Sequence, residues 1–252
     1  MYLYEGGNVF DGTVDIPKEY VASIVKTIQR ELPSGVKAIP DIGSAGYKVA
    51  SGDMDMFIDA EALIANFNSD DEKSAKVALA KYFQAKGYNT KLSGRNVHVQ
   101  VPFETDRGKS SAQVDLMVIK DAERVADWHQ HGPRGSYEDP NFKANHLYIL
   151  LNSIAKFLGL KVDAFAGTVM RRDNNEVVAD NRNRAAKILL NPKAKGTDLN
   201  SVATVMAALA TDPDREGKLA QALQDQQKGV LTLPETIVPG TAAWFRKMGH
   251  HL

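Results

Sequence analysis

The sequence predicts an α+β protein: a mixed or antiparallel sheet with helices over residues 1–120, followed by a mostly helical region over 121–252. Two observations lead to this prediction. Apolar and polar residues alternate, as on a half-buried strand, in three segments of the first part, namely 53–59, 96–103 and 112–119. Beyond residue 140, apolar residues instead recur every three or four positions, as on the buried side of a helix. With 43% apolar residues, the chain has enough material for a hydrophobic core.

Two helices are expected in the first part. The first is predicted over 17–31, because Pro17 suits the first turn of a helix and apolar residues follow at helical spacing, at Val21, Ile24, Val25 and Ile28. The second is expected to begin with Ser69 as its N-cap, since the acidic residues that follow Ser69 favour the positive end of the helix dipole. Gly87 is predicted to end this second helix.

Strands are expected to fill the rest of the first part. One is predicted over 36–42, leading into Gly43-Ser44, and the next over 53–59. A hairpin is predicted around Ser93-Gly94, because alternating segments flank this turn dipeptide, at 88–92 and 96–103. The segment 112–119 is expected to form the last strand.

The second part is expected to contain one hairpin and several helices. Asp173-Asn174-Asn175 separates two short apolar segments and is typical of a hairpin turn. Helices are predicted over 141–158, 185–190, 198–210 and 213–228.

Three aspartates are the candidate catalytic and metal-ligating residues. Asp53 and Asp55 lie two positions apart in the segment Ser51-Gly52-Asp53-Met54-Asp55, so a strand would direct both carboxylates to the same face. Asp115 alternates with Val114 and Leu116 in a later strand, so it is expected to face away from the core and to be exposed. Neighbouring carboxylates repel each other, and a divalent cation such as Mg²⁺ relieves this repulsion.

Residues around the first two aspartates are candidates for binding a triphosphate. Gly43 lets the backbone approach a phosphate without a Cβ, and Ser44 offers a hydroxyl and an N–H. Lys48, Ser51 and Gly52 lie close by in the sequence. Each short pattern also occurs without function, because Asp-x-Asp is found on solvated strand faces and Gly-Ser in ordinary turns. Their order along the chain is more specific than any one of them.

This order resembles the signature of the polymerase-β-type nucleotidyltransferase superfamily, namely Gly-Ser, a spacer, Asp-apolar-Asp and a third Asp on a later strand. The segment 51–55 is similar to the palm motif of family X DNA polymerases, and 114–116 to their third-carboxylate strand. Gly135-Ser136, followed by Phe142 and Asn145, resembles their thumb segment beside the incoming nucleotide. The sequence departs from the family after Gly-Ser, because Ala45-Gly46-Tyr47 precedes the first basic residue.

The resemblance implies a nucleotidyltransferase palm and a thumb-like region, in a minimal form such as viruses encode. It implies two Mg²⁺ ions, with Mn²⁺ as a substitute, held by Asp53, Asp55 and Asp115. It also implies a nucleoside triphosphate at Gly43, Ser44 and the thumb segment, and transfer of its nucleoside monophosphate to an acceptor hydroxyl, with a nucleic-acid 3′ end as the expected acceptor. Transfer to a protein, a tRNA or a small molecule stays open, as does a palm-fold protein that only binds.

Charge and composition add expectations about partners. The net charge is zero, with 31 basic and 31 acidic residues, which gives no support for strong non-specific nucleic-acid binding. Residues 161–195 nevertheless carry eight cationic against four acidic residues, and Arg171 and Arg172 are the preferred pair for holding an acceptor.

The chain has no Cys, no apolar segment long enough to span a membrane and no signal-peptide pattern at its start, so a cytoplasmic protein is expected, or one in the host cytoplasm if viral.

Overall fold

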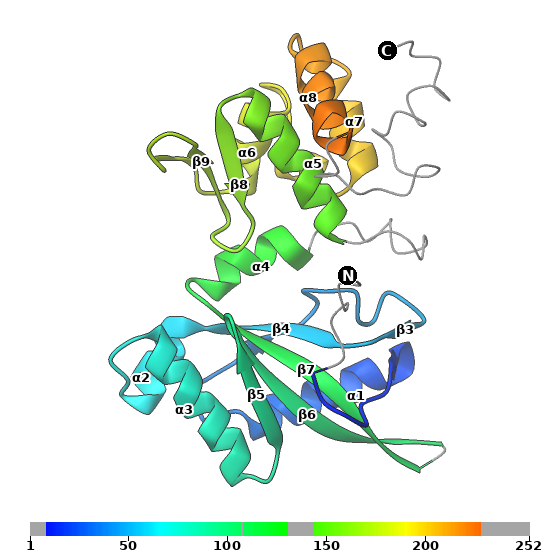
Figure 1. Cartoon of the computed structure of the whole chain (residues 1–252), viewed down its shortest axis with the longest axis vertical. Coiled ribbons are helices and arrows are strands. Elements are labelled where there is room, and N and C mark those ends of the chain that lie inside the picture. Colours follow the sequence, from blue (N-terminus) through cyan, green and yellow to red (C-terminus); the bar gives the residue numbers. More distant parts are fainter. Residues whose placement is uncertain (1–8, 107, 131–143, 228–252) are drawn as a thin grey trace. The chain divides into compact units, whose positions relative to one another are not determined.

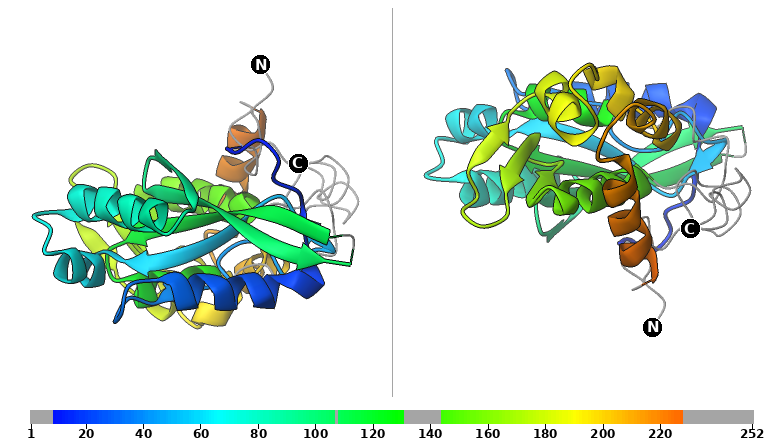
Figure 2. Two further views of the ribbon diagram at one scale, coloured as in Figure 1. Left: turned by 90° about the horizontal axis from the view of Figure 1, so that it is seen from below. Right: turned by 90° about the horizontal axis from the view of Figure 1, so that it is seen from above.

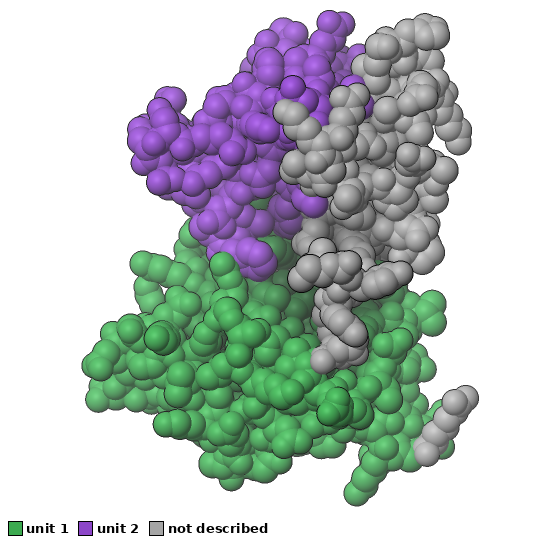
Figure 3. Space-filling model, viewed as in Figure 1, with its two compact units in different colours: residues 1–130 green, residues 131–252 purple. Residues whose placement is uncertain are grey.

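The computed structural model describes residues 9–106, 108–130 and 144–227 (Figure 1). Backbone contacts divide the chain into two compact units, residues 1–130 and 131–252 (Figure 3). The predicted boundary after residue 120 would separate helix α4 (Ala122–Gln130) from unit 1, yet α4 packs on strands of that unit.

Unit 1 is built around a mixed five-stranded sheet. Its strands, in spatial order, are β2 (Ala38–Ile39), β4 (Met54–Asp59), β7 (Gly108–Ile119), β6 (Asn96–Thr105) and β5 (Asn89–Ser93). The β4–β7 pair is parallel and the other pairs are antiparallel. The predicted hairpin is confirmed, with Gly94 in the left-handed region at φ 49° between β5 and β6. A separate two-stranded ladder joins β1 (Ile16–Pro17) to β3 (Ala50–Ser51).

The helices of unit 1 correct one predicted N-cap and include two helices that were not predicted. They are α1 (Lys18–Glu31), α2 (Ala60–Phe67), α3 (Glu72–Ala85) and α4. The N-cap of α3 is Asp71, which forms a capping box with Ser74, and not Ser69 as predicted. Helix α2 was not predicted; it begins directly after β4 because the Asp59 carboxylate accepts a hydrogen bond from the backbone N–H of Ala62 at 3.0 Å.

Strand β2 is much shorter than the predicted strand over 36–42. Pro40 has no N–H to donate to a neighbouring strand, and Asp41 lies in the left-handed region at φ 65°. Both features end the strand, so Gly43 and Ser44 lie in a turn and not at the end of a long strand. In this turn the backbone N–H groups of Tyr47 and Lys48 donate to the carbonyl of Ser44.

The two faces of the unit 1 sheet are covered unequally. One face carries the apolar side chains of β4, β6 and β7 and packs against α1, α2 and α3 in one large hydrophobic core. Figure 2 shows α1 running along the sheet. On the opposite face a smaller apolar cluster joins α4 to Phe57 and Ile119, with Met117 packed against it. Phe57 and Ile119 lie in the second halves of β4 and β7. Earlier in the same two strands, this face carries the polar side chains of Asp55 and Asp115.

Unit 2 contains helices and one small antiparallel sheet, of strand order β10-β9-β8. The strands are β8 (Leu160–Asp163), β9 (Thr168–Arg171) and β10 (Val177–Ala179), and β9–β10 is the predicted second hairpin. The helices are α5 (Ala144–Phe157), α6 (Arg182–Leu189), the 3₁₀ helix η2 (Gly196–Leu199), α7 (Val202–Leu209) and α8 (Arg215–Gln227). The α+β class is confirmed, although strand β8 was not predicted. Among the described helices, none combines the length and the apolarity that crossing a bilayer requires.

Candidate functional site

A row of four polar side chains crosses the unit 1 sheet on the face opposite the large core. Asp55 of β4 lies directly opposite Asp115 of β7 in the parallel ladder. Asp115 is paired with His98 of β6, and His98 is paired with Lys91 of β5. Directly paired residues direct their side chains to the same face of a sheet, so these four side chains form one row. Two of the three predicted catalytic aspartates are therefore adjacent across the β4–β7 pair.

Asp53 precedes β4 by one residue and interacts electrostatically with the aspartates of this row. Burial, and next the neighbouring Asp115 carboxylate, raise the pKa of Asp53 to about 6. Burial, followed by the carboxylates of Asp53 and Asp115, raises the pKa of Asp55 to about 8. Without a cation, the site thus disfavours the fully ionised state of its carboxylates. Each of the two raised pKa values has a neighbouring carboxylate among its causes, which indicates that the three groups lie close together.

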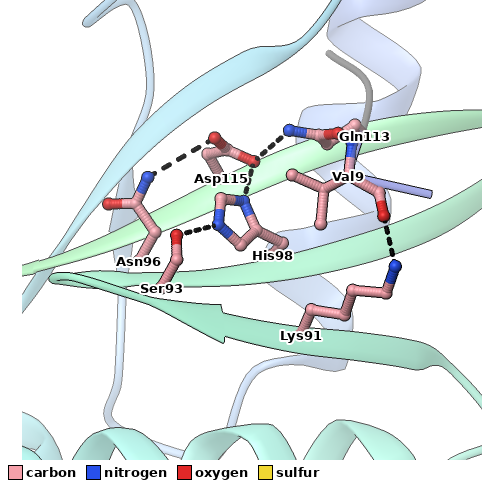
Figure 4. Close-up of polar contacts among 7 residues, drawn as sticks. All are labelled: Val9, Lys91, Ser93, Asn96, His98, Gln113 and Asp115. Atoms are coloured by element: carbon pink, nitrogen blue, oxygen red, sulfur yellow. Dashed lines mark hydrogen bonds and ion pairs between the residues drawn. The ribbon is translucent and has the colours of Figure 1, made fainter. Parts of the chain in front are cut away.

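The Asp115 side chain is buried and held by three hydrogen-bond donors (Figure 4). Its Oδ1 is 2.7 Å from His98 Nδ1 and accepts from Gln113 Nε2 at 2.9 Å, and its Oδ2 accepts from Asn96 Nδ2 at 3.4 Å. Asp115 is only 5% exposed, so the expectation that it is exposed was wrong. The reason is its strand: β7 is the middle strand of five, and side chains of β4 and β6 flank Asp115 on both sides.

Of the predicted triphosphate-binding residues near β4, Gly43 lies against Asp55, Ser44 lies against Ser51, and Lys48 lies near Asp53. A Cβ on Gly43 would lie 2.5 Å from Asp55 Oδ2, so only glycine fits here without displacing the carboxylate. The hydroxyls of Ser44 and Ser51 are 3.4 Å apart, and Ser51 is held by the β1–β3 ladder. Lys48 is half-buried and lies near enough to Asp53 to lower the pKa of that carboxyl, against the larger effects that raise it.

The donor chemistry of the three aspartates suits Mg²⁺, because all their candidate ligand atoms are carboxylate oxygens. As the side chains stand, no three acidic or histidine side chains within the described ranges surround one point closely enough to hold a metal ion. Asp115 Oδ1 already accepts from two donors, whereas among the residues that the structure describes Oδ2 has only the long contact to Asn96. Cation binding by all three aspartates therefore requires that the Asp53 and Asp55 side chains turn towards Asp115 Oδ2 within the existing backbone register.

The remaining predicted residues belong to unit 2. Gly135 and Ser136, the predicted thumb contacts to the nucleotide, lie outside the described residues. Arg171 is exposed and pairs with Glu176 at 3.1 Å. Arg172 donates through Nε to the carbonyl of Leu160 at 2.7 Å and lines a cavity of about 470 Å³ together with Tyr148, Asn152 and Lys156. Arg182, counted among the cations of this region, is buried at 7% exposure and so adds little to a binding surface.

Sequence reasoning missed His98, Gln113 and Asn96. A signal for His98 was present, because it alternates with Val97, Val99 and Val101, which lie in the large core. The same alternation that placed Asp115 on the polar face therefore places His98 there too. Its position beside Asp115 depends on the antiparallel register of β6 and β7, which the sequence does not specify.

Comparison with known proteins leaves the family open. No family model matches the chain, and no curated protein matches its sequence. Among solved structures, the chain is similar to polymerase β of Leishmania infantum in a ternary P/T complex, at 11% identity and a TM-score of 0.48. This similarity covers 73% of the chain and 76% of that structure. At this identity and TM-score, function has to be argued from the site itself.

Proposed function

We propose that the protein is a Mg²⁺-dependent nucleotidyltransferase that moves a nucleoside monophosphate from an NTP or dNTP to an acceptor hydroxyl. Asp53, Asp55 and Asp115 are the proposed metal ligands, and Gly43, Ser44 and Lys48 the proposed triphosphate contacts. A nucleic-acid 3′ end is the proposed acceptor, with Arg171 and Arg172 among its contacts. A bound pair of Mg²⁺ ions would neutralise the charge that develops on the phosphates.

One observation carries this proposal: the in-register pairing of Asp55 with Asp115 across parallel strands, with Asp53 beside them. A sheet does not gain from like charges placed side by side, and the raised pKa values of Asp53 and Asp55 reflect burial first and repulsion between the carboxylates second. Gly43 supports the same proposal, since its missing Cβ leaves room against the Asp55 carboxylate. A structural role alone does not account for three carboxylates and a glycine gathered in this way.

The proposed reaction is an in-line displacement at the α-phosphorus. The acceptor hydroxyl oxygen forms a bond to that phosphorus, and the bond from the phosphorus to the bridging oxygen breaks, so pyrophosphate leaves with the electron pair. The proton of the acceptor hydroxyl passes to Asp115 Oδ2, the less strongly hydrogen-bonded oxygen of that carboxylate. Ser44 and Lys48 orient and neutralise the triphosphate, and Asp53 and Asp55 would hold the cations that neutralise charge on the phosphates.

A second candidate function is a palm-like protein that binds but does not catalyse. It is favoured by the burial of Asp115 and by the three donors that hold its carboxylate, which leave little freedom to turn towards a cation. On this reading, the Asp115 network is a structural tie between β6 and β7. The two candidates differ in one measurable respect, namely whether a nucleotide becomes covalently attached to an acceptor.

The test is a label-transfer assay on the full chain. The protein is incubated with Mg²⁺, each α-labelled nucleoside triphosphate in turn, and either primed DNA, single-stranded DNA, tRNA or no acceptor. The proposal expects label in a nucleic acid or in the protein itself, lost in Asp55→Asn and retained in Asp70→Asn. Asp70 is the matched control, because it is exposed before α3 and the substitution removes the same charge. Transfer that is absent throughout, or equal in both variants, refutes the proposal.

A further inference from the structure

The Asp115 carboxylate is the inner end of a chain of hydrogen bonds that reaches the surface. His98 Nδ1 lies 2.7 Å from Asp115 Oδ1, and His98 Nε2 lies 2.6 Å from the Ser93 hydroxyl (Figure 4). His98 is 4% exposed, whereas Ser93 is an exposed residue at the end of β5. Both ring nitrogens are thus engaged, so the imidazole is fixed in one orientation beside the carboxylate.

The hydrogen-bond donors can be assigned for an ionised Asp115 beside a neutral His98. An ionised carboxylate only accepts, so Nδ1 of His98 carries the proton that bonds Asp115. A neutral imidazole has one N–H, so Nε2 accepts and the Ser93 hydroxyl donates to it. The Asp115 carboxylate therefore sets the tautomer of His98, and the Ser93 hydroxyl holds the second ring nitrogen, so that the ring keeps its orientation beside Asp115.

Gln113 completes the support on the same side of the carboxylate. It is fully buried, donates to Asp115 Oδ1 at 2.9 Å, and accepts through Oε1 from the backbone N–H of Val9 at 2.9 Å. Lys91, the last residue of the polar row, bonds the carbonyl of Val9. Both donors to Oδ1 are therefore themselves held by other groups, so this oxygen has a fixed position and little remaining capacity for a cation.

Resting on the proposed function, we infer that His98, held by Ser93, is a positioning residue that locks Asp115 Oδ1 and thereby presents Oδ2 to the metal. Within the described ranges, Oδ2 has only a 3.4 Å contact to Asn96, so it has lone pairs for a cation. Because His98 bonds at both nitrogens, at 2.7 Å and 2.6 Å, its ring cannot turn without losing the contact to Asp115 or to Ser93. Partners of this kind typically change metal affinity or activity by about 10–100-fold when removed.

The experiment compares three variants of the full chain with wild type. His98→Leu removes both nitrogens, and His98→Asn keeps an amide donor near the position of Nδ1. His129→Leu is the matched histidine control, since the His129 ring packs against Phe57 with the ring centroids 5.1 Å apart, and the three donors that hold Asp115 do not include His129. Mn²⁺ binding is measured by electron paramagnetic resonance, kcat and the KM for nucleotide by label transfer, and folding by circular dichroism.

The expected result is weaker Mn²⁺ binding and lower kcat in His98→Leu, each by about 10-fold or more, with KM changed by less than about twofold. His98→Asn is expected to recover most of both losses, and His129→Leu to match wild type. Ser93→Ala, at an exposed position, is expected to fold and to show a smaller loss in the same direction. If His98→Leu fails to fold, His98→Asn and Ser93→Ala decide the matter.

Several outcomes overturn the inference. It fails if folded His98→Leu binds Mn²⁺ and transfers nucleotide like wild type, or if His98→Asn loses as much as His98→Leu, because packing then explains the residue. It also fails if wild type does not bind Mn²⁺, or if Asp115→Asn binds Mn²⁺ as tightly as wild type does. If wild type binds Mn²⁺ through Asp115 but transfers no label, the proposed function is refuted and the inference about His98 is not. Mn²⁺ binding by the His98 variants then tests whether His98 positions Asp115.

Discussion

Asp55→Asn tests the electrostatics of the site through folding stability. The pKa of Asp55 is raised from 3.8 to about 8, so between these values the folded protein binds more protons than the unfolded chain. Its stability is therefore greatest below about pH 4 and falls as pH rises through about 8. A shift of about four pKa units corresponds to at most about 6 kcal/mol. Because Asp55 is partly exposed and titrates together with Asp53, we expect about a third of this, near 2 kcal/mol.

The assay is urea unfolding at pH 5 and pH 8.5, with and without Mg²⁺. A Trp244→Phe background leaves Trp128, which is buried in unit 1, as the single fluorescent tryptophan. Wild type should lose about 1.5 kcal/mol of unfolding free energy between the two pH values, since the rest of the effect falls below pH 5, and should regain part of it with Mg²⁺ at pH 8.5. Asp55→Asn should show a flatter pH dependence and little gain from Mg²⁺. The reasoning is refuted if metal-free wild type is equally stable at both pH values, or if Mg²⁺ stabilises the variant as much as wild type.

Three further predictions concern the turn beside β4, unit 2 and the α3 cap. Gly43→Ala should displace the Asp55 carboxylate and lower kcat by about 10-fold or more, with unfolding free energy changed by less than about 1 kcal/mol; an unchanged kcat would contradict it. Replacing Arg171 and Arg172 together by Ala should weaken acceptor binding most at low salt and flatten its salt dependence, measured by fluorescence anisotropy. Asp71→Ala should lower the unfolding free energy by about 1 kcal/mol in urea denaturation, because it removes the capping box of α3.

The matched control for the arginine prediction lies in the same unit. Arg184 and Lys187 are exposed on α6, and replacing both by Ala removes the same charge. An equal loss of salt dependence in this control would show that the total positive charge of unit 2, and not the location of Arg171 and Arg172, determines acceptor binding. A loss confined to the first pair would support a defined path for the acceptor.

Side-chain alternation made much of the candidate site predictable. It placed Asp53, Asp55 and Asp115 on faces opposite their apolar neighbours, and the described strands bear this out for Asp55 and Asp115. Local alternation carries no information about which strand lies beside which. The parallel β4–β7 pair and the antiparallel β6–β7 register therefore had to come from the structure, and with them the burial of Asp115 and its contact with His98.

Element boundaries were less predictable where two local signals competed. Ser69 and Asp71 both belong to residue types that favour the N-cap. Asp71 is the N-cap of α3 because Ser74, three residues later, completes a capping box with it. The predicted strand over 36–42 shortened because Pro40 and the positive φ of Asp41 outweighed its apolar content. Thumb contacts at Gly135 and Ser136 stay predictions.

The parallel β4–β7 pairing limits how this chain can vary. Parallel neighbours are joined only by a crossover, so the segment from α2 to β6 can lengthen or shrink at its loops without moving Asp55 relative to Asp115. A single inserted or deleted residue within β7, however, would turn Asp115 towards the apolar side and bring a core residue opposite Asp55. Length changes between the strands should thus be tolerated, whereas length changes inside them should eliminate the carboxylate pair in one step.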